Sequence, residues 1–295
     1  MADTSAARTR HALLFGGSGQ IGQALLDRLC GAGWRVTAVS REPQPARAGV
    51  DWRLGGFEDL PVLPLRVDAV FSAGPLDRFS HWYRDVGVRA PRVVAFGSTS
   101  VDTKGDSVDA AERDVARRLV EAEAAVLAAA HARGAHATLL RPTLVYGCGR
   151  DATLSRVAAL AARWRVFPLP EGARGLRQPV HVEDLAAAAM ACVHVPASYG
   201  KAYALPGGEA LAYRDMIRRV LASLQPPAYC LELPPPLFQL LLGLANGLGM
   251  ARGLGAAVPR MREDLVFDAR PAMRDFGYAP RPFEPEASMF RPMAA

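Results

Sequence analysis

The fold is decided by residues 12–22, which read Ala12-Leu13-Leu14-Phe15-Gly16-Gly17-Ser18-Gly19-Gln20-Ile21-Gly22. An apolar run of strand length leads directly into a glycine-rich turn, and the turn opens a segment with helical periodicity. Gly16 allows the tight turn, Gly19 removes the Cβ that would block a pyrophosphate, and Gly22 lets the helix pack on the strand. The free backbone amides and the dipole of the helix favour phosphate groups. The stretch therefore predicts a dinucleotide-binding turn that uses Gly16, Ser18, Gly19, Gln20, Ile21 and Gly22.

Beyond this turn, apolar runs of strand length alternate with helical segments rich in Ala and Leu. We predict strands at residues 11–15, 35–40, 69–73, 92–96 and 137–140, and helices at 21–32, 112–133 and 183–193. The alternation is typical of βαβ units, whose parallel sheet is buried on both faces. The predicted fold class is therefore α/β, with a Rossmann-type doubly wound parallel sheet.

The organisation of the chain changes near residue 154. Prolines cluster at 226–227 and 234–236, and short helices are separated by loops rather than by clear strands. We expect a dinucleotide-binding domain over residues 1–153, with helix 183–193 packing back on it. Residues 154–295 would mostly form a smaller C-terminal lobe that covers a substrate, because ligands of open α/β sheets bind beyond the carboxyl ends of the strands.

Composition argues against several classes of protein. The 295 residues are half apolar and can bury a full core, and the net charge of +6 comes from arginines that alternate with acids along the chain. A solvated mixed surface, without a nucleic-acid partner, fits this pattern. The 4 cysteines show no CxxC and no histidine at ligand spacing, which favours reduced thiols over a metal site.

The N-terminus and the longest apolar stretch bear on where the protein is expected to act. The first ten residues lack an apolar signal-peptide core, and the longest apolar stretch, residues 237–250, is too short to span a bilayer. We predict a cytoplasmic protein without an integral membrane segment, and we read 237–250 as a core or cap helix with peripheral membrane contact as the alternative. A homodimer is left open.

The end of the second strand bears on the choice of cofactor. A site that prefers NAD usually has Asp or Glu here, which accepts hydrogen bonds from the ribose hydroxyls. This chain instead has Val39-Ser40-Arg41, and a hydroxyl with a guanidinium suits the 2′-phosphate of NADP. Glu42 follows and keeps NAD as the alternative. We predict NADP, with Ser40 and Arg41 in its site.

Further segments in the same order along the chain carry a family resemblance. Together with the glycine turn they are residues 70–75, 96–101, 140–147 and 177–186. This set resembles the extended and atypical short-chain dehydrogenase/reductase superfamily, in particular the NAD-dependent epimerase/dehydratase family. The resemblance implies an oxidoreductase, epimerase or dehydratase that acts on a small polar or nucleotide-linked substrate. It also implies that Ala73 and Gly74 lie against the cofactor and that the turn at Pro142 lies beside the nicotinamide.

Candidate catalytic residues follow the fourth and fifth predicted strands. Ser98 and Thr99 come after strand 92–96, so their hydroxyls should emerge near the nicotinamide, or alternatively hold the loop by bonds to its backbone. Pro142 would set a turn that carries Tyr146 towards the cleft. His181 is expected to be a hydrogen-bonded structural residue, with a place in the cleft as the alternative, and Asp184 is expected to cap the helix that follows it.

The chain departs from the resembled family at its proton relay. Catalytic members use Tyr and Lys four residues apart on the helix that corresponds to 112–133 here, where the ammonium lowers the pKa of the phenol. Helix 112–133 contains neither residue type, and no tyrosine in the chain has Lys four positions on. We therefore predict Ser98, Thr99 and Tyr146 as the catalytic residues, with Tyr146 as a substitute acid. The competing hypothesis is a sensor or accessory subunit that binds NADP(H) without turnover.

Overall fold

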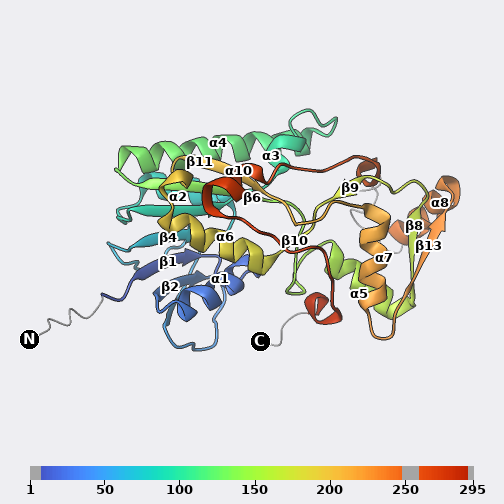
Figure 1. Cartoon of the computed structure of the whole chain (residues 1–295), viewed down its shortest axis with the longest axis horizontal. Helices are drawn as coiled ribbons and strands as arrows, with labels where there is room; N and C mark the ends of the chain where they lie inside the picture. The colour runs from blue at the N-terminus through green and yellow to red at the C-terminus, as the bar shows by residue number, and fades with distance from the viewer. Residues whose placement is uncertain (1–7, 248–258, 292–295) are drawn as a thin grey trace, which may run out of the picture.

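The computed structural model describes residues 8–247 and 259–291, which form a sheet domain and a smaller lobe (Figure 1). The sheet has seven parallel strands in the order β11-β6-β5-β4-β1-β2-β3. Their bounds are β1 His11–Phe15, β2 Arg35–Ser40, β3 Val50–Leu54, β4 Ala69–Ser72, β5 Arg92–Phe96, β6 His136–Pro142 and β11 Lys201–Leu205. This architecture confirms the predicted Rossmann-type parallel sheet.

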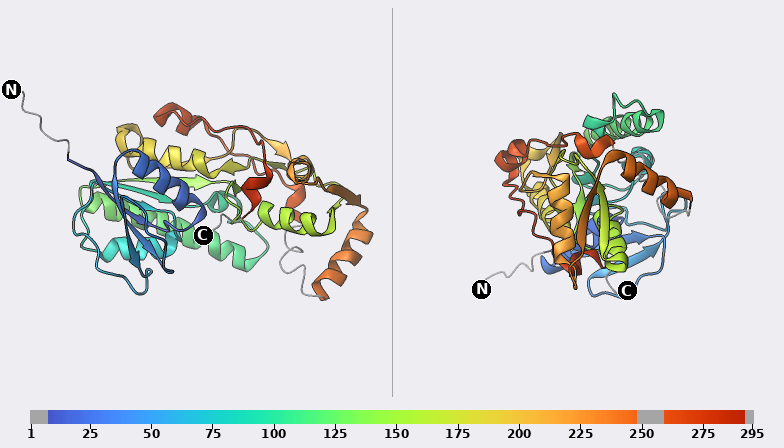
Figure 2. Two further views of the ribbon diagram at one scale, coloured as in Figure 1. Left: turned by 90° about the horizontal axis from the view of Figure 1, so that it is seen from below. Right: turned by 90° about the vertical axis from the view of Figure 1, so that its right-hand side faces the viewer.

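Helices cover both faces of the sheet, and Figure 2 shows the two layers with the strands between them. One layer contains α1 (Gln20–Gly31), α6 (Val182–His194) and α10 (Arg270–Phe276), and the other contains α2 (Leu76–Asp85) and α4 (Ala110–Ala132). Side chains of β1 alternate between these layers. Leu14 packs in the cluster with α1 and α6, while Leu13 packs in the cluster with α2 and α4. This alternation explains why a buried parallel strand is apolar at every position.

The predicted elements are present, with ends shifted by a few residues, and four elements assigned above to the sheet domain were not predicted. These are β3, α2, β11 and α10. β3 is partly exposed along its length and carries Asp51 and Arg53, so its apolar pattern is weak. β11 lies in the half of the chain for which the sequence predicted no clear strand. That expectation is wrong, because β11 pairs with β6 from Lys201 to Leu205.

The smaller lobe has its own apolar core. This core comes mainly from α5 (Leu154–Trp164), β8 (Val166–Pro170) and α7 (Tyr213–Ser223). The lobe also contains β13 (Tyr229–Leu233), which pairs with β8, and α8 (Pro235–Gly247), whose leucines are largely exposed. Two short ladders pair β7 (Val145–Tyr146) with β10 (Val180–His181) and β9 (Leu176–Arg177) with β12 (Leu211–Ala212). Between these pieces the chain returns to the sheet domain as α6, β11 and α10. A boundary at residue 153 therefore does not divide the chain into two continuous domains, although helix α6 packs back on α1.

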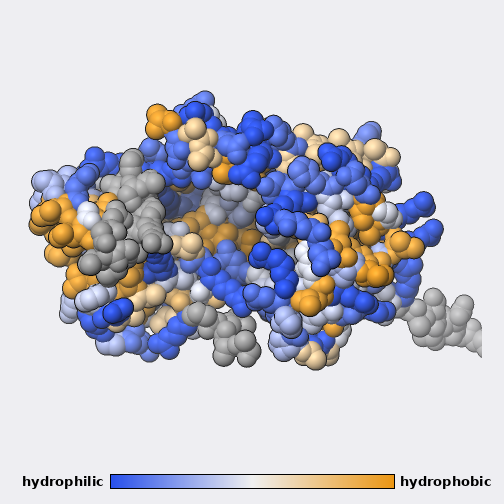
Figure 3. All heavy atoms as spheres, turned by 180° about the vertical axis from the view of Figure 1, so that it is seen from behind, coloured by the Kyte–Doolittle hydropathy of each residue, from blue (hydrophilic) through white to orange (hydrophobic). Residues whose placement is uncertain are grey.

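The surface mixes charges of both signs. Polar side chains cover much of the face in Figure 3, and many arginines pair with acids nearby, as Arg219 does with Glu209 at 2.6 Å. No helix among the described residues has the length and apolar character needed to cross a membrane. Part of the apolar stretch 237–250 lies in α8, and residues 248–250 lie outside the described residues, so peripheral membrane contact stays a hypothesis.

Candidate functional site

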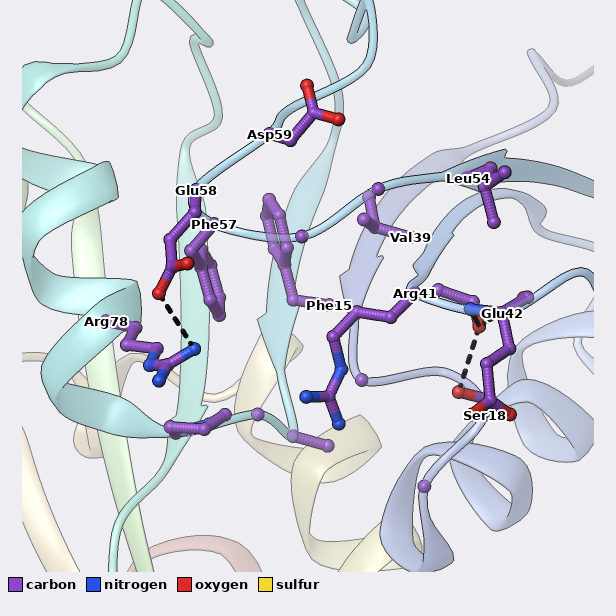
Figure 4. Close-up of a pocket in the computed structure, with 18 of the residues that line it drawn as sticks. Phe15, Ser18, Val39, Arg41, Glu42, Leu54, Phe57, Glu58, Asp59 and Arg78 are labelled. Atoms are coloured by element: carbon purple, nitrogen blue, oxygen red, sulfur yellow. Dashed lines mark hydrogen bonds and ion pairs between the residues drawn. The ribbon is translucent and has the colours of Figure 1, made fainter.

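A cavity of about 780 Å³ opens at the carboxyl ends of β1, β2 and β4 (Figure 4). The sheet reverses its strand order here, because β1 is flanked by β2 on one side and β4 on the other. The cavity is lined by Phe15, Gly16, Ser18, Gly19, Val39, Ser40, Arg41, Glu42, Leu54, Gly55, Gly56, Phe57, Glu58, Asp59, Ala73, Gly74, Pro75, Arg78 and Arg150. Seven of the predicted cofactor-binding residues are in this lining: Gly16, Ser18, Gly19, Ser40, Arg41, Ala73 and Gly74.

The glycines of the turn are required by close backbone contacts. Gly16 has a φ of +74°, and a Cβ on it would lie 2.8 Å from the carbonyl carbon of Ala73. A Cβ on Gly22 would lie 2.8 Å from the Cα of Gly17, so this glycine lets the helix pack on the turn itself rather than on the strand. A Cβ on Gly19 would meet only the carbonyl oxygen of Gly16, at 3.2 Å, and would otherwise point into open space. Gly19 thus leaves a cradle of the kind that a close-lying phosphate fills.

The N-terminus of α1 has no acidic or capping side chain on its first backbone amides. Its N-cap is Gly19, no side chain accepts from its first amides, and no acidic residue lies in its first turn. Four backbone N–H groups at the start of any helix lack intrahelical partners, and the dipole adds a partial positive charge there. Gln20, Ile21 and Gly22 form this first turn and follow directly on Gly19, which lines the cavity, although they are not in the lining themselves. A phosphate group of a ligand would satisfy these donors.

Ser40 and Arg41 lie at the end of β2 but have different surroundings. Ser40 is buried, and its hydroxyl donates to the carbonyl oxygen of Glu42 at 2.7 Å. Its Oγ also lies 3.2 Å from the Oγ of Ser18, whose hydroxyl can donate to it, so the turn after β2 is tied to the glycine turn. The aliphatic stem of Arg41 lies beside Gly56, whose Cβ would be 3.4 Å away. Figure 4 shows its guanidinium inside the cavity, and within the described residues no carboxylate pairs with it.

The opposite wall is aromatic with a charged rim. Phe57 stacks on Phe15 with the ring centroids 4.8 Å apart, and a Cβ on Gly74 would lie 3.4 Å from the Phe57 ring. Arg78 forms an ion pair with Glu58 at 3.2 Å, so its charge is partly neutralised (Figure 4). The cavity therefore combines a flat apolar wall with cationic groups, as a nucleotide would require.

The Ser98-Thr99 loop lies outside the lining of this cavity. Thr99 is buried, and its hydroxyl donates to the carbonyl oxygen of Pro142 at 3.2 Å. Ser98 is half-buried, and its Oγ bonds with the Oγ of Ser100 at 3.0 Å. Both bonds fit the alternative in which hydroxyls hold the loop. The bond of Thr99 joins the loop after β5 to Pro142 at the end of β6.

Tyr146 does not reach the cavity. It is 1% exposed and belongs to the apolar core of the smaller lobe, where its ring packs edge-on to Phe283 with centroids 4.9 Å apart. Burial raises the pKa of its phenol to about 12. The prediction that the turn after Pro142 carries Tyr146 towards the cleft is therefore wrong. The pairing of β7 with β10 points the ring into the lobe instead.

His181 has the structural role that the sequence favoured. It is the N-cap of α6, and its Nδ1 accepts from the amide of Glu183 at 3.2 Å. Burial lowers the pKa of the imidazole to about 4, so the ring is neutral at physiological pH. Asp184 was expected to cap this helix, and that expectation is wrong, because its carboxylate accepts from Nε of Arg281 at 2.9 Å.

One buried ion pair near the Ser98 loop was missed by sequence reasoning. Arg141 on β6 donates from Nε to Glu123 on α4 at 2.8 Å, and from Nη1 to Asp102 at 3.2 Å. Glu123 is 6% exposed and lies under Gly97, whose Cβ would be 3.1 Å from its Oε1. The sequence did contain one signal for this buried acid, because Glu123 stands between Ala122 and Ala124 on the predicted helix. Among the described residues no cluster of His, Cys, Asp and Glu could hold a metal ion.

Comparisons with known proteins give one sequence relative and many structural neighbours. No family model matches the chain. A UDP-glucose 4-epimerase from Vibrio cholerae is 25% identical over 207 residues, which is 66% of this chain and 60% of that protein. The chain thus spans less than two thirds of the length of the curated relative that it matches.

Solved structures with the same fold cover nearly the whole chain. MoeE5 in complex with UDP-glucuronic acid and NAD has a TM-score of 0.70 at 21% identity, over 95% of this chain and 97% of that one. UDP-glucuronic acid 4-epimerase from Bacillus cereus in complex with NAD has a TM-score of 0.68 at 12% identity, over 95% and 96%. The NAD-dependent NDP-hexosamine 5,6-dehydratase TunA has a TM-score of 0.64 at 19% identity, over 95% and 95%. The chain therefore has the fold of these epimerases and dehydratases, and it is similar in sequence to a UDP-glucose 4-epimerase.

Proposed function

We propose that the chain is an NADP(H)-dependent enzyme that acts as an epimerase, dehydratase or oxidoreductase on a nucleotide-linked substrate. The observation that carries this proposal is the guanidinium of Arg41 inside a cavity built on a glycine turn. A carboxylate at this position would accept bonds from ribose hydroxyls, whereas an unpaired guanidinium supplies charge and donors for a 2′-phosphate. Two of the solved neighbours are complexes with NAD. The proposed preference for NADP therefore rests on the residues of this chain alone. Glu42 at the rim keeps NAD as the alternative.

The residues present fit a dinucleotide. The turn from Gly16 to Gly22 would hold the diphosphate through backbone donors, and Ala73 and Gly74 would lie along the adenosine half. The nicotinamide, when bound, supplies hydride transfer. Pro142 and the loop that starts at Ser98 stand at the carboxyl ends of β6 and β5, where that ring is expected.

Proton handling is the unusual part of this site. The helix α4 carries neither Tyr nor Lys, and the buried Tyr146 offers no replacement. Of the two remaining candidates, Ser98 is the better positioned to orient a substrate oxygen, since it is half-buried while Thr99 donates to Pro142. A hydroxyl of this kind orients a substrate oxygen but is a weak acid, which favours slow turnover.

The absent pair and the burial of Tyr146 favour a second candidate function. In this alternative the chain binds NADP(H) without turnover and serves as a redox sensor or accessory subunit. Both candidates place the protein in the cytoplasm with small-molecule ligands, and a homodimer is compatible with either.

One experiment separates these functions. The full-length protein is titrated with NADPH and NADH, and it is then incubated with UDP-glucose, UDP-glucuronic acid and simple carbonyl compounds while products are followed by NMR. Tighter binding of NADPH together with conversion of any substrate supports the enzyme. Binding without conversion supports the sensor, and failure to bind either dinucleotide overturns both.

A further inference from the structure

Arg150 reaches the cofactor cavity from the opposite lobe. It lies in the loop between β7 and α5, yet its guanidinium donates to the carbonyl oxygen of Ser18, which is 132 residues away in sequence. Arg150 also lines the cavity together with Gly16 and Gly19. The smaller lobe therefore places the guanidinium of Arg150 against the glycine turn of the sheet domain.

The loop that carries Arg150 is anchored on both sides. The amide of Gly149 donates to the carbonyl oxygen of Met289 at 2.7 Å. The carboxylate of Asp151 accepts from the amides of Thr153 at 3.1 Å and Ser155 at 3.0 Å, so it caps the start of α5. Asp151 is thus engaged with the helix rather than with the neighbouring guanidinium. The position of Arg150 follows from the packing of the smaller lobe.

The charge of Arg150 is not neutralised by the protein. Its acceptor is a neutral carbonyl, and no carboxylate in the described part of the chain pairs with it. A guanidinium has five N–H donors, so most remain available beside the N-terminus of α1. Permanent charge and a planar set of donors are the features that bind phosphate oxygens in pairs.

We propose that Arg150 binds the diphosphate of a nucleotide ligand, and that this ligand is the dinucleotide, held between the glycine turn and the smaller lobe. This inference rests on the proposed function, because it takes the cavity to be the dinucleotide site. It assigns different tasks to two arginines. Arg41 recognises the 2′-phosphate that only NADP carries, whereas Arg150 contacts the diphosphate that NAD and NADP share. A diphosphate is also present in a nucleotide-sugar substrate, so the test distinguishes these two sources.

The test measures binding of NADH, NADPH and UDP to the full-length protein by calorimetry. The variants are Arg150→Gln, Arg150→Lys and Arg41→Gln, and Arg163→Gln is the matched control, since Arg163 is an exposed arginine of the same lobe. We expect Arg150→Gln to weaken NADH and NADPH alike, by about 10- to 100-fold, as for the loss of a charged hydrogen bond. Arg150→Lys should retain part of the affinity, Arg41→Gln should weaken NADPH alone, and Arg163→Gln should change nothing.

Each outcome decides the inference. The inference is overturned if the Arg150→Gln variant binds both dinucleotides with affinities within twofold of wild type. A loss confined to UDP overturns it as well and assigns the guanidinium to the substrate diphosphate. If wild type binds no dinucleotide, the proposed function fails together with the inference. If wild type binds NADPH and Arg150→Gln binds it equally well, only the role of Arg150 is lost.

Discussion

The ring of Tyr146 meets the imidazole of His181 edge to face, with the two centroids 5.1 Å apart and the planes at 79°. The two residues are register partners in the short parallel ladder of β7 and β10. This contact places the phenol in the smaller lobe and the imidazole at the start of α6. Neither group is free to act on a ligand in the cofactor cavity.

Tyr146→Phe should therefore leave turnover within about twofold of wild type. Loss of a general acid costs roughly 10² to 10⁴ in rate, but the pKa of this buried phenol is raised to about 12 and the ring is 1% exposed. The measurement is the steady-state rate with the substrate found in the conversion assay. Tyr146→Ala is the contrasting variant, and it should lower the free energy of unfolding by about 3 to 5 kcal/mol because it empties a packed site. A hundredfold loss of rate in a stably folded Tyr146→Phe protein would restore the catalytic role.

Gly19→Val should abolish dinucleotide binding without unfolding the protein. The Cβ at this position points into the cavity and meets only the oxygen of Gly16, at 3.2 Å. Binding is measured by titration and folding by circular dichroism. Gly22→Ala is the comparison, because its Cβ would overlap the backbone of Gly16 and should destabilise the fold itself. Retained binding in Gly19→Val would mean that the dinucleotide lies elsewhere.

Arg41→Ala should remove most of the preference for NADPH over NADH. The guanidinium has no carboxylate partner in the described chain and projects into the cavity, so its full charge is available to a 2′-phosphate. A charged hydrogen bond of this type corresponds to about 10- to 100-fold in affinity. The check is a pair of titrations at one salt concentration. Equal affinities of wild type for NADPH and NADH would contradict the assignment at the outset.

Stability should fall as the pH drops from about 6.5 to about 4, with His181 as one cause. Burial lowers the pKa of this imidazole from 6.5 to about 4, so the unfolded chain binds a proton in this window and the folded chain does not. A single such group changes the free energy of unfolding by up to about 1.4 kcal/mol per pH unit. Denaturant unfolding at several pH values measures the slope. His181→Asn keeps an N-cap that cannot titrate and should flatten the slope, and an unchanged slope would exclude His181.

Arg92→Met should destabilise the protein by about 2 to 4 kcal/mol. Arg92 is buried on β5, donates to the carbonyl oxygen of Cys192 at 2.7 Å and to that of Val193 at 3.2 Å, and lies 3.8 Å from the centroid of the Tyr199 ring. Removing it leaves the carbonyl of Val193 without this donor and leaves that of Cys192 only the hydroxyl of Ser198, at 3.1 Å. Arg92→Lys should cost less, because an ammonium still satisfies part of this set. Thermal unfolding of both variants tests the order, and equal stability of the methionine variant would contradict it.

The sheet was predictable because its strands are apolar at nearly every position. β1, β2 and β5 are buried on both faces, which produces continuous runs that the sequence displays directly. β3 at the edge of the sheet lacks such a run, and β11 pairs with β6 across the whole smaller lobe, so the pairing leaves no local pattern in the sequence. The site shows the same contrast between local and long-range features.

Backbone requirements were predictable, and side-chain directions were not. The positive φ of Gly16 follows from the turn that links a strand to a helix. The direction of Tyr146 depends on its register with His181, and the approach of Arg150 to Ser18 depends on how the lobe packs on the sheet domain. Both are long-range relationships for which one sequence contains no local signal.

The position of β11 beside β6 has a consequence for synthesis on the ribosome. About 60 residues separate the end of β6 at Pro142 from the start of β11 at Lys201, and translation at roughly 5–20 residues per second takes about 3 to 12 s to add them. During this interval the outer edge of β6 has no partner strand, and an unpaired edge is a template for association between chains. The nascent protein is therefore most exposed to misassembly while the smaller lobe is being made.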